Sequence, residues 1–314
     1  MNIMKTKHKV VVGFSVNPEF EINVGGDAKE PKKTLRRFSG RLSGSSGNVA
    51  IALQTLGVSP RLLGLVGVSP VHENSWEGKF FDELVRSSGF SFWGIPALQR
   101  TNIAAIPVVN EKNGEVWGRR NGVLRHAIRP ALRMLESFGS NKQAFAVVTS
   151  LRGGELPFAT SLLAATQEGY RVLNAKDTLC RRPGFVRLLR IVDVVVLNRQ
   201  EFAATNMSYD AIHRRGPKIV VVTHDKDGGY CPFCGKIFSF APHSFKGGVF
   251  ETGAGDWFLG ALVAELIRHE ENAASCSMNQ FRDIIDFSAK VAGKKITMSG
   301  GSNGPTRVQL RQPA

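Results

Sequence analysis

The sequence predicts a three-layer α/β/α protein, with a mostly parallel central sheet and helices on both of its faces. Short, almost entirely apolar runs such as Ile191–Leu197 (IVDVVVL) and Lys218–Thr223 (KIVVVT) are typical of strands buried on both faces. These runs alternate with segments of helical spacing, and that alternation favours right-handed βαβ units. No internal repeat or low-complexity linker interrupts residues 1–314, so we expect a single domain.

The expected elements follow in order from the apolar runs and from the residues that break them. Lys9–Phe14 is a buried first strand, and Asn48–Leu56 is a helix that Gly57 ends as a C-terminal cap. Between them, Phe20–Leu42 is polar, basic and punctuated by glycine, which predicts short strands outside the main core. The other expected strands are Arg61–Val66, Asn102–Val109, Ala144–Val148 and Tyr170–Leu173, and the other expected helices are Lys79–Arg86, Phe158–Gln167, Ala254–Arg268 and Phe281–Lys294.

The chain has 314 residues, with 41 Lys and Arg against 26 Asp and Glu, and a formal charge of +15. Its hydrophobic share of 42% excludes a disordered basic tail. A basic surplus points to anionic partners such as nucleic acid, an acidic membrane or a phosphorylated small molecule. The basic residues are scattered, without a dense run interleaved with aromatics, so nucleic acid is not an expected partner. No stretch is long and apolar enough to predict a membrane span, and four cysteines in so long a chain fit a reducing cytoplasm.

The most informative segment is Glu251–Ala261 (ETGAGDWFLGA), in which small residues lead directly into a helix. Unpaired backbone N–H groups at Gly253, Ala254 and Gly255 can bind an anion there, and the helix dipole favours negative charge. Asp256 follows in the first helical turn, placed to take a proton from an attacking hydroxyl. The combination indicates phosphoryl transfer. On a structural interpretation, the same residues simply make a tight strand-to-helix turn, and Asp256 only stabilises the helix.

GAGDWFLGAL resembles the C-terminal signature of the PfkB carbohydrate kinases, the ribokinase-like sugar and nucleoside kinases. Their N-terminal signature has its counterpart in Ser43–Ala50 (SGSSGNVA), and Asn198–Glu201 (NRQE) looks like the family's Asn-x-x-Glu. Matches follow in order from about Val10 to Pro305. The resemblance implies a ribokinase-like fold with a small β-rich lid near residues 20–42, with part of 100–125, and a possible homodimer contact through that lid.

The resemblance also implies an enzyme that uses ATP and Mg²⁺ to phosphorylate a sugar or phosphosugar. It implies these roles: Asp256 as the catalytic base; Gly253, Ala254 and Gly255 as the anion hole; Asn198 and Glu201 as organisers of Mg²⁺ and its waters; Thr223 and Gly228 beside the nucleotide; and Gly44, Gly47 and Asn48 against the acceptor. Taken alone, Asn198 and Glu201 also fit a helix N-cap with its capping-box partner, a structural interpretation compatible with the functional one.

Two fragments are similar to the phosphosugar branch of the family, the 1-phosphofructokinase and tagatose-6-phosphate kinase-like members. Asn17–Glu21 (NPEFE) resembles their Asn-Pro-x-x-Asp, with Glu21 in place of the Asp that binds sugar hydroxyls. Arg100–Ile103 (RTNI) resembles a segment whose arginine helps hold a substrate phosphate. Arg152 is a second phosphate candidate. For each arginine the alternative is a solvated surface charge.

Other positions depart from the family pattern. Phe250 stands where ribokinase-like members often have an Asp that helps hold a monovalent cation, so potassium activation is not expected unless Glu251 compensates. Ser43 replaces the first glycine of the N-terminal signature, and Ser45 replaces a Lys common in phosphosugar relatives. These departures leave two alternatives: a nucleoside kinase of the same family, or a catalytically weak kinase scaffold that acts as a basic binding or regulatory module.

Cys231 and Cys234 form a CxxC pair between two expected strands. One such pair supplies half of a zinc site, which His224 or His243 could complete. The alternative is two free thiols in a hairpin.

Overall fold

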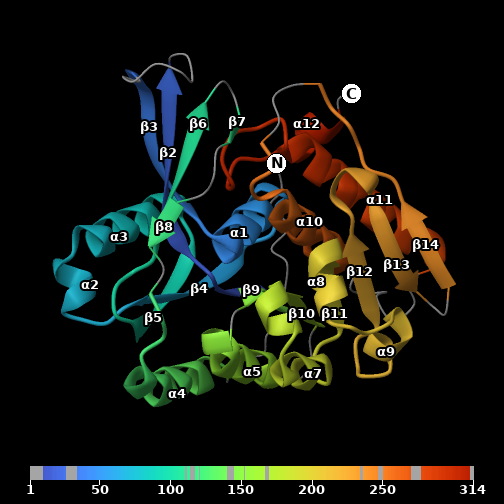
Figure 1. The fold of residues 1–314 in the computed structure, drawn as a ribbon, viewed down its shortest axis with the longest axis horizontal. Coiled ribbons are helices and arrows are strands. Elements are labelled where there is room, and N and C mark those ends of the chain that lie inside the picture. The colour runs from blue at the N-terminus through green and yellow to red at the C-terminus, as the bar shows by residue number, and fades with distance from the viewer. Residues whose placement is uncertain are drawn as a thin grey trace.

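The computed structural model describes residues 10–25, 34–109, 112–113, 117–119, 121–139, 145–151, 153–166, 170–233, 236–246, 250–269 and 277–311. Its centre is a large sheet with the strand order β14-β13-β12-β11-β10-β9-β1-β4-β5 (Figure 1). The strands from β5 to β12 pair in parallel, and β13 and β14 close one edge in antiparallel fashion. Their bounds are β1 Val10–Phe14, β4 Pro60–Gly67, β5 Ser91–Leu98, β9 Phe145–Leu151, β10 Tyr170–Ala175, β11 Val194–Asn198, β12 Ile219–Thr223, β13 Gly229–Phe233 and β14 Lys236–Phe240.

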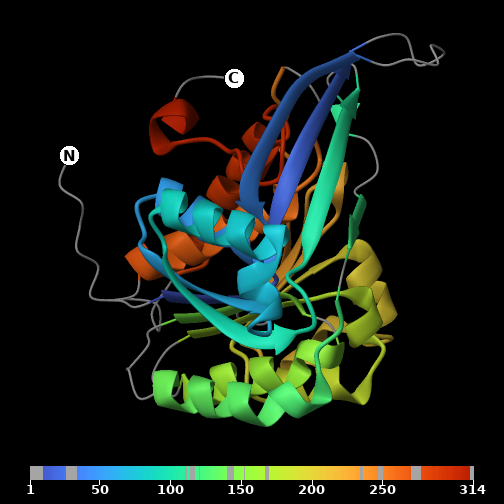
Figure 2. The same ribbon diagram turned by 90° about the vertical axis from the view of Figure 1, so that its left-hand side faces the viewer.

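Helices cover both faces of this sheet, as Figure 2 shows edge-on. Alternate strand residues serve alternate cores: Val10 and Val12 belong to one apolar cluster and Val11 to the other. The first cluster takes in helices α1 (Ser45–Thr55), α10 (Ala254–Arg268) and α11 (Met278–Lys295), and the second takes in α4 (Ile128–Gly139), α5 (Leu156–Ala165) and α7 (Pro183–Leu189). The predicted three-layer α/β/α class is therefore confirmed.

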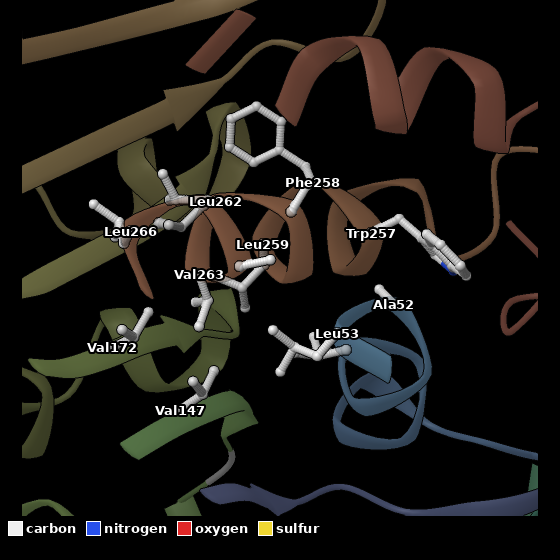
Figure 3. Close-up of a cluster of buried hydrophobic side chains, with 14 of the residues drawn as sticks. Ala52, Leu53, Val147, Val172, Trp257, Phe258, Leu259, Leu262, Val263 and Leu266 are labelled. Atoms are coloured by element: carbon white, nitrogen blue, oxygen red, sulfur yellow. The ribbon is translucent and has the colours of Figure 1, made fainter. Parts of the chain in front are cut away.

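Helix α10 lies in the middle of the first core (Figure 3). Its Leu259 and Val263 are buried near Val147 of β9 and Val172 of β10, in one apolar cluster. Gly260 allows α1 to approach closely, because a Cβ at that position would lie 2.6 Å from the Cβ of Ala52. This packing fixes α10 and thereby fixes the position of its N-terminus at the edge of the sheet.

A second, smaller sheet rises from the side of the large one (Figures 1 and 2). Its strand order is β3-β2-β6-β7, with β8 also paired to β6; β2 pairs antiparallel with β3 and parallel with β6. Its strands are β2 Asn17–Gly25, β3 Thr34–Ser43, β6 Ile103–Val109, β7 Lys112–Asn113 and β8 Trp117–Arg119. The expected small β-rich part is thus present, and the strand predicted at Asn102–Val109 belongs to it, within the 100–125 stretch that the resemblance assigned in part to the lid.

Short helices complete the described structure. They are α2 Val71–Asn74, α3 Trp76–Ser88, α6 Asp177–Cys180, α8 Arg199–Ala204, α9 Tyr209–His213 and α12 Arg307–Arg311. Helix α3 packs under the second sheet, where the ring of Phe80 stacks on Phe20 with centroids 4.9 Å apart. None of the helices among the described residues has the length and apolar character needed to cross a bilayer.

Several elements were not expected from the sequence, among them strand β5 and helices α4, α6, α7 and α9. Strand β5 contains Gly94 and Pro96, which interrupt its apolar pattern. The strand forms because it pairs in parallel with β4. Helix α4 carries Pro130 in its first turn, a position that a helix tolerates.

Candidate functional site

Two adjoining cavities open at the carboxyl ends of the parallel strands, the edge where open α/β sheets bind ligands. One has a volume of about 380 Å³ and contains Asp256 in its wall; we call it the Asp256 cavity. The other has a volume of about 470 Å³ and is walled partly by Phe240; we call it the Phe240 cavity. Both cavities are lined by Thr223, Asp225 and Gly255, so they meet beside the N-terminus of α10.

The start of α10 has the geometry of an anion site. Gly253 caps the helix with φ +85°, and a Cβ there would lie 2.5 Å from the carbonyl oxygen of Gly301. The first intrahelical bond runs from Trp257 N–H to Gly253 O (2.9 Å), so the amides before Trp257 precede the regular helix ladder. One of them, Ala254 N–H, bonds back to Glu251 O (3.1 Å). Of the predicted anion-hole residues, Gly253 lines the Asp256 cavity, Ala254 the Phe240 cavity, and Gly255 both.

Asp256 is held by Asn48, whose Nδ2 donates to its Oδ2 at 2.8 Å. Burial raises the pKa of the Asp256 carboxyl and Glu19 adds to the shift, whereas hydrogen bonds from Asn48 and Ser45 and the charge of Lys176 oppose it. A carboxylate with a raised pKa accepts a proton more readily than an ordinary one. The structure thus brings together Asn48 and Asp256, which lie 208 residues apart in the sequence.

Ser43 connects Asn48 to a second carboxylate. Its Oγ lies 2.7 Å from Glu19 Oε2, to which it donates, and 3.0 Å from Asn48 Oδ1. Both side chains line the Asp256 cavity together with Ser43 itself. A glycine at position 43, as in the family signature, would lack this hydroxyl bridge.

Asn198 and Glu201 form the capping box at the start of α8. Glu201 N–H donates to Asn198 Oδ1 (2.8 Å), and Asn198 N–H donates to Glu201 Oε2 (2.9 Å). The structural interpretation is therefore confirmed, and both residues also line the Asp256 cavity. Burial raises the pKa of Glu201, while Lys176, with its Nζ 3.7 Å from Oε1, opposes the shift. Oxygen atoms of this kind are the ligands that Mg²⁺ and its waters prefer, so the two residues fit that ion.

The Phe240 cavity has apolar walls and a charged rim. The rings of Phe240 and Phe258 stack with centroids 5.8 Å apart, and small residues of α11, Ala289, Ala292 and Gly293, leave space beside them. The predicted residues Thr223 and Gly228 are in its wall, and Arg199 and Lys226 supply positive charge. A slot of this kind suits a flat ring system that carries anionic groups.

The candidate acceptor residues are only partly brought together. Gly44 and Asn48 line the Asp256 cavity, whereas Gly47 is buried within van der Waals distance of Leu42 and Val16. Glu21 is buried against Arg41 and is not among the residues in the cavity wall.

The carboxylate of β2 that lines the wall is Glu19, two residues earlier on the same face of the strand. Sequence reasoning missed it. It also missed Asn174 and Lys176, although their place at the end of the strand predicted at Tyr170–Leu173 is a signal for this edge.

Of the two arginines proposed to bind phosphate, Arg100 is described by the structure and is not among the residues that line the Asp256 cavity. Arg100 is exposed, and its Nη1 lies 3.9 Å from Glu77 Oε1, away from the residues that line the wall. Arg152 lies outside the described residues.

Only one cysteine of the CxxC pair, Cys231, is among the residues that the structure describes. Cys231 is a buried free thiol whose pKa is raised by burial, and Cys234 lies outside the described residues. The part of the chain that the structure describes contains no cluster of three or more His, Cys, Asp or Glu that could hold a metal.

Comparison with known families and structures gives a consistent result. The model of the "pfkB family carbohydrate kinase" matches residues 7–307. A search of curated protein sequences finds no match.

Solved structures resemble the whole chain at low sequence identity. The ribokinase from Giardia lamblia has a TM-score of 0.71 and 18% identity, covering 97% of this chain and 99% of that one. Phosphofructokinase-2 from Escherichia coli in complex with potassium has a TM-score of 0.72 and 17% identity, covering 97% of both chains. A nucleoside kinase from Methanocaldococcus jannaschii has a TM-score of 0.68 and 14% identity, also covering 97% of both. At these identities the likeness shows the fold alone.

Proposed function

The chain belongs to the pfkB family of carbohydrate kinases, and we propose that it transfers the γ-phosphoryl group of ATP to a hydroxyl of an uncharged sugar. One observation carries the proposal: two cavities of different character meet at the N-terminus of α10, with the Asp256 carboxylate on one side of the junction. That arrangement suits a donor and an acceptor that must meet at one phosphorus atom.

ATP binds in the Phe240 cavity, with its ring system beside Phe240 and its phosphates directed toward Gly253–Gly255. The amides and dipole at the start of α10 stabilise the negative charge of the transferred group. Arg199 and Lys226 line the same cavity and offset part of the negative charge of Asp225, Asp227 and Glu251, so the main support for an anion there is the start of α10.

The acceptor binds in the Asp256 cavity, where Asp256 accepts the proton of the attacking hydroxyl as the new P–O bond forms. Asn48 holds that carboxylate in place, and desolvation makes it a better base than an exposed aspartate. Glu201 and Asn198 would hold Mg²⁺, which would offset the negative charge of the ATP phosphates. Lys176, next to Glu201, adds a positive charge to the same wall.

The charges of the described wall favour an uncharged acceptor over a phosphosugar. Glu19, Asp225, Asp256 and Glu201 line the Asp256 cavity, and Lys176 is the cation among the described lining residues. A second phosphate on the acceptor would face these carboxylates without a compensating arginine from the described wall. The many neutral hydrogen-bonding groups of the wall suit sugar hydroxyls; they include Ser15, Asn17, Ser43, Ser45, Ser150 and Asn174.

The test is ATP consumption, coupled to ADP detection, with a panel of neutral sugars, phosphosugars and nucleosides. We expect Mg²⁺-dependent turnover with a neutral sugar, and turnover reduced about 10²-fold or more in the Asp256→Asn variant on that acceptor. Turnover with nucleosides alone would support the nucleoside-kinase alternative. Absence of turnover on every acceptor, with salt-sensitive binding to nucleic acid, would instead support the basic binding module.

A further inference from the structure

Lys295, at the end of α11, is a charged side chain with no exposed surface. Its Nζ donates to the carbonyl oxygen of Met298 at 2.9 Å. A buried ammonium is costly unless nearby groups compensate its charge. The reaction described above gives this residue no role, so its place in the core needs another explanation.

The Met298–Gly301 segment that follows α11 makes contacts with the elements that build the Asp256 cavity. Gly301 N–H lies 3.4 Å from Glu19 Oε1 on β2, and Gly301 O accepts from Trp257 Nε1 on α10 at 3.1 Å. Ser299 O accepts from Arg41 Nη1 on β3 at 3.4 Å. We call residues 298–301 the α11 turn.

Three of the groups that the α11 turn touches line the Asp256 cavity. A Cβ built on Gly301 would lie 2.9 Å from Asn48 Nδ2, and one built on Gly253 would lie 2.5 Å from Gly301 O. Glu19, Asn48 and Gly253 all belong to the cavity wall. A shift of the α11 turn would therefore displace the partner of Asp256 and the cap of the anion site together.

Lys295 and Arg41 are the cations of a buried charge cluster around this turn. The charged groups that face Lys295 are Arg41 on β3, Glu19 and Glu21 on β2, and Asp256 on α10. Arg41 is ion-paired with Glu21, and its Nε lies 3.8 Å from Glu19 Oε1. Two cations thus offset two of the three carboxylate charges, and removal of either cation leaves one more negative charge uncompensated.

We propose that Lys295 is a positioning residue for phosphoryl transfer, whose ammonium group holds the α11 turn and balances the carboxylates beneath the acceptor site. This role rests on the proposed kinase function. It differs from that of Asp256, because Lys295 lines neither cavity and acts through the turn, Glu19 and Asn48.

The charge of Lys295 also gives the site an upper pH limit. Burial, with the charge of Arg41 acting in the same direction, lowers the pKa of Lys295 to about 8, while Glu19, Asp256 and Glu21 oppose the shift. The ammonium is present at neutral pH and is lost above about pH 8. In the unfolded chain Lys295 keeps its proton to higher pH, so its titration alone makes the folded state more stable as pH rises above 8. As the pH rises above about 8, activity should therefore fall while this contribution to the stability of the folded state increases.

The first experiment compares the wild type with Lys295→Met, using Lys294→Met as the matched control on the same helix. Lys294 lies over the ring of Phe245, at 5.1 Å from its centroid, and lines neither cavity. We expect Lys295→Met to lower kcat/KM for the acceptor about 100-fold, the size of a small misplacement of reacting groups. KM for ATP should change little, and the alkaline decline of the wild type near pH 8 should be absent. Lys294→Met should behave as the wild type in both respects.

The second experiment uses Lys295→Ala with added methylammonium or ethylammonium, which can occupy the vacated volume. Recovery of kcat by the amines, and not by sodium at equal ionic strength, would support the proposal. Wild-type kcat in Lys295→Met with an unchanged pH profile would overturn it. If neither variant folds, the wild type decides: constant activity from pH 7 to 10 would overturn the proposal. Failure of the wild type on every acceptor would overturn the kinase function first, and this role with it.

Discussion

The two cavities that meet at α10 are built in different ways. The Phe240 cavity is shaped by small residues and by backbone: Gly228 has φ +79°, and a Cβ on Gly293 would lie 2.1 Å from His243 O. The Asp256 cavity is shaped by polar and charged side chains that bond across long sequence separations, such as Asn48 to Asp256 and Gly301 to Glu19. A substitution in the Phe240 cavity should change activity by filling space. A substitution in the Asp256 cavity should change it by altering charge or the alignment of the side chains.

The largest expected effect is that of Asp256→Asn, which removes charge from the Asp256 cavity without changing its shape. We expect kcat to fall by about 10²–10⁴-fold, the usual contribution of a general base. Burial raises the pKa of this carboxyl, so its charged form is costly in the folded state, and the variant should unfold at the same or a higher temperature. Steady-state kinetics and thermal unfolding measure the two effects.

A loss of activity together with a large drop in unfolding temperature would show that Asp256 acts mainly on the structure. Substantial residual kcat in a folded variant would remove Asp256 from the role of base. Because Asn can still accept the hydrogen bond from Asn48, the variant separates charge from geometry.

The difference between the cavities also explains what the sequence could predict. The proposed anion site and its base occupy consecutive residues from Gly253 to Asp256, and the capping box spans Asn198 to Glu201, so local spacing alone indicates both. Glu19 could not be chosen over Glu21 from the sequence, because both point to one face of β2. Only the contacts with Ser43, Arg41 and Gly301 decide which carboxylate reaches the wall.

The fold shows the same distinction between local and long-range information. Apart from β5, the parallel strands of the main sheet were predicted, because a continuous apolar run indicates a buried strand without knowledge of its partner strand. The apolar run at Asn102–Val109 predicts a strand, but its place in the lid came only from the family resemblance, since pairing with β2 depends on residues far earlier in the chain. The role of Lys295 could not be predicted from the sequence for a related reason. Its surroundings are the α11 turn and charged groups from β2, β3 and α10, which are distant in the chain.

The decline of kcat at acid pH tests whether the Asp256 cavity depends on the charge of its carboxylate. Protonation of Asp256 should reduce kcat by about tenfold for each pH unit below the pKa of this group in the bound enzyme. This decline should begin above the range of an ordinary aspartate, because burial raises the pKa. A carboxyl with a raised pKa binds its proton at a higher pH in the folded state than in the unfolded chain. The contribution of Asp256 to stability therefore increases as the pH falls through that range.

Parallel kcat and unfolding measurements from pH 7 to pH 4 would check this prediction. In Asp256→Asn the acid stabilisation from this group should be absent. An activity profile that stays flat down to pH 4 would contradict a desolvated base.

Steric substitutions should separate the cavities by their substrates. Ala292→Leu extends into the Phe240 cavity and should raise KM for ATP about tenfold, equivalent to roughly 1.4 kcal/mol of binding, with little change in KM for the acceptor. Ala104→Leu extends into the Asp256 cavity and should raise KM for the acceptor, with little change in KM for ATP. Ala164→Leu on α5 is the matched control, exposed on the other side of the main sheet.

Initial-rate kinetics with each substrate varied in turn would measure both constants. Equal increases of both KM values in either variant would mean that the cavities do not bind separate substrates.

The smallest expected effect concerns potassium. Phe250 is buried, and its N–H donates to Ile296 O at 2.7 Å, so an apolar ring fills the position where a carboxylate would help bind a cation. Glu251 is exposed and faces the Phe240 cavity instead. Replacing potassium by choline at constant ionic strength should therefore change kcat less than about twofold, within the range of general screening effects. Activation by potassium that choline does not reproduce would contradict this prediction and would show that the ion binds without a carboxylate at position 250.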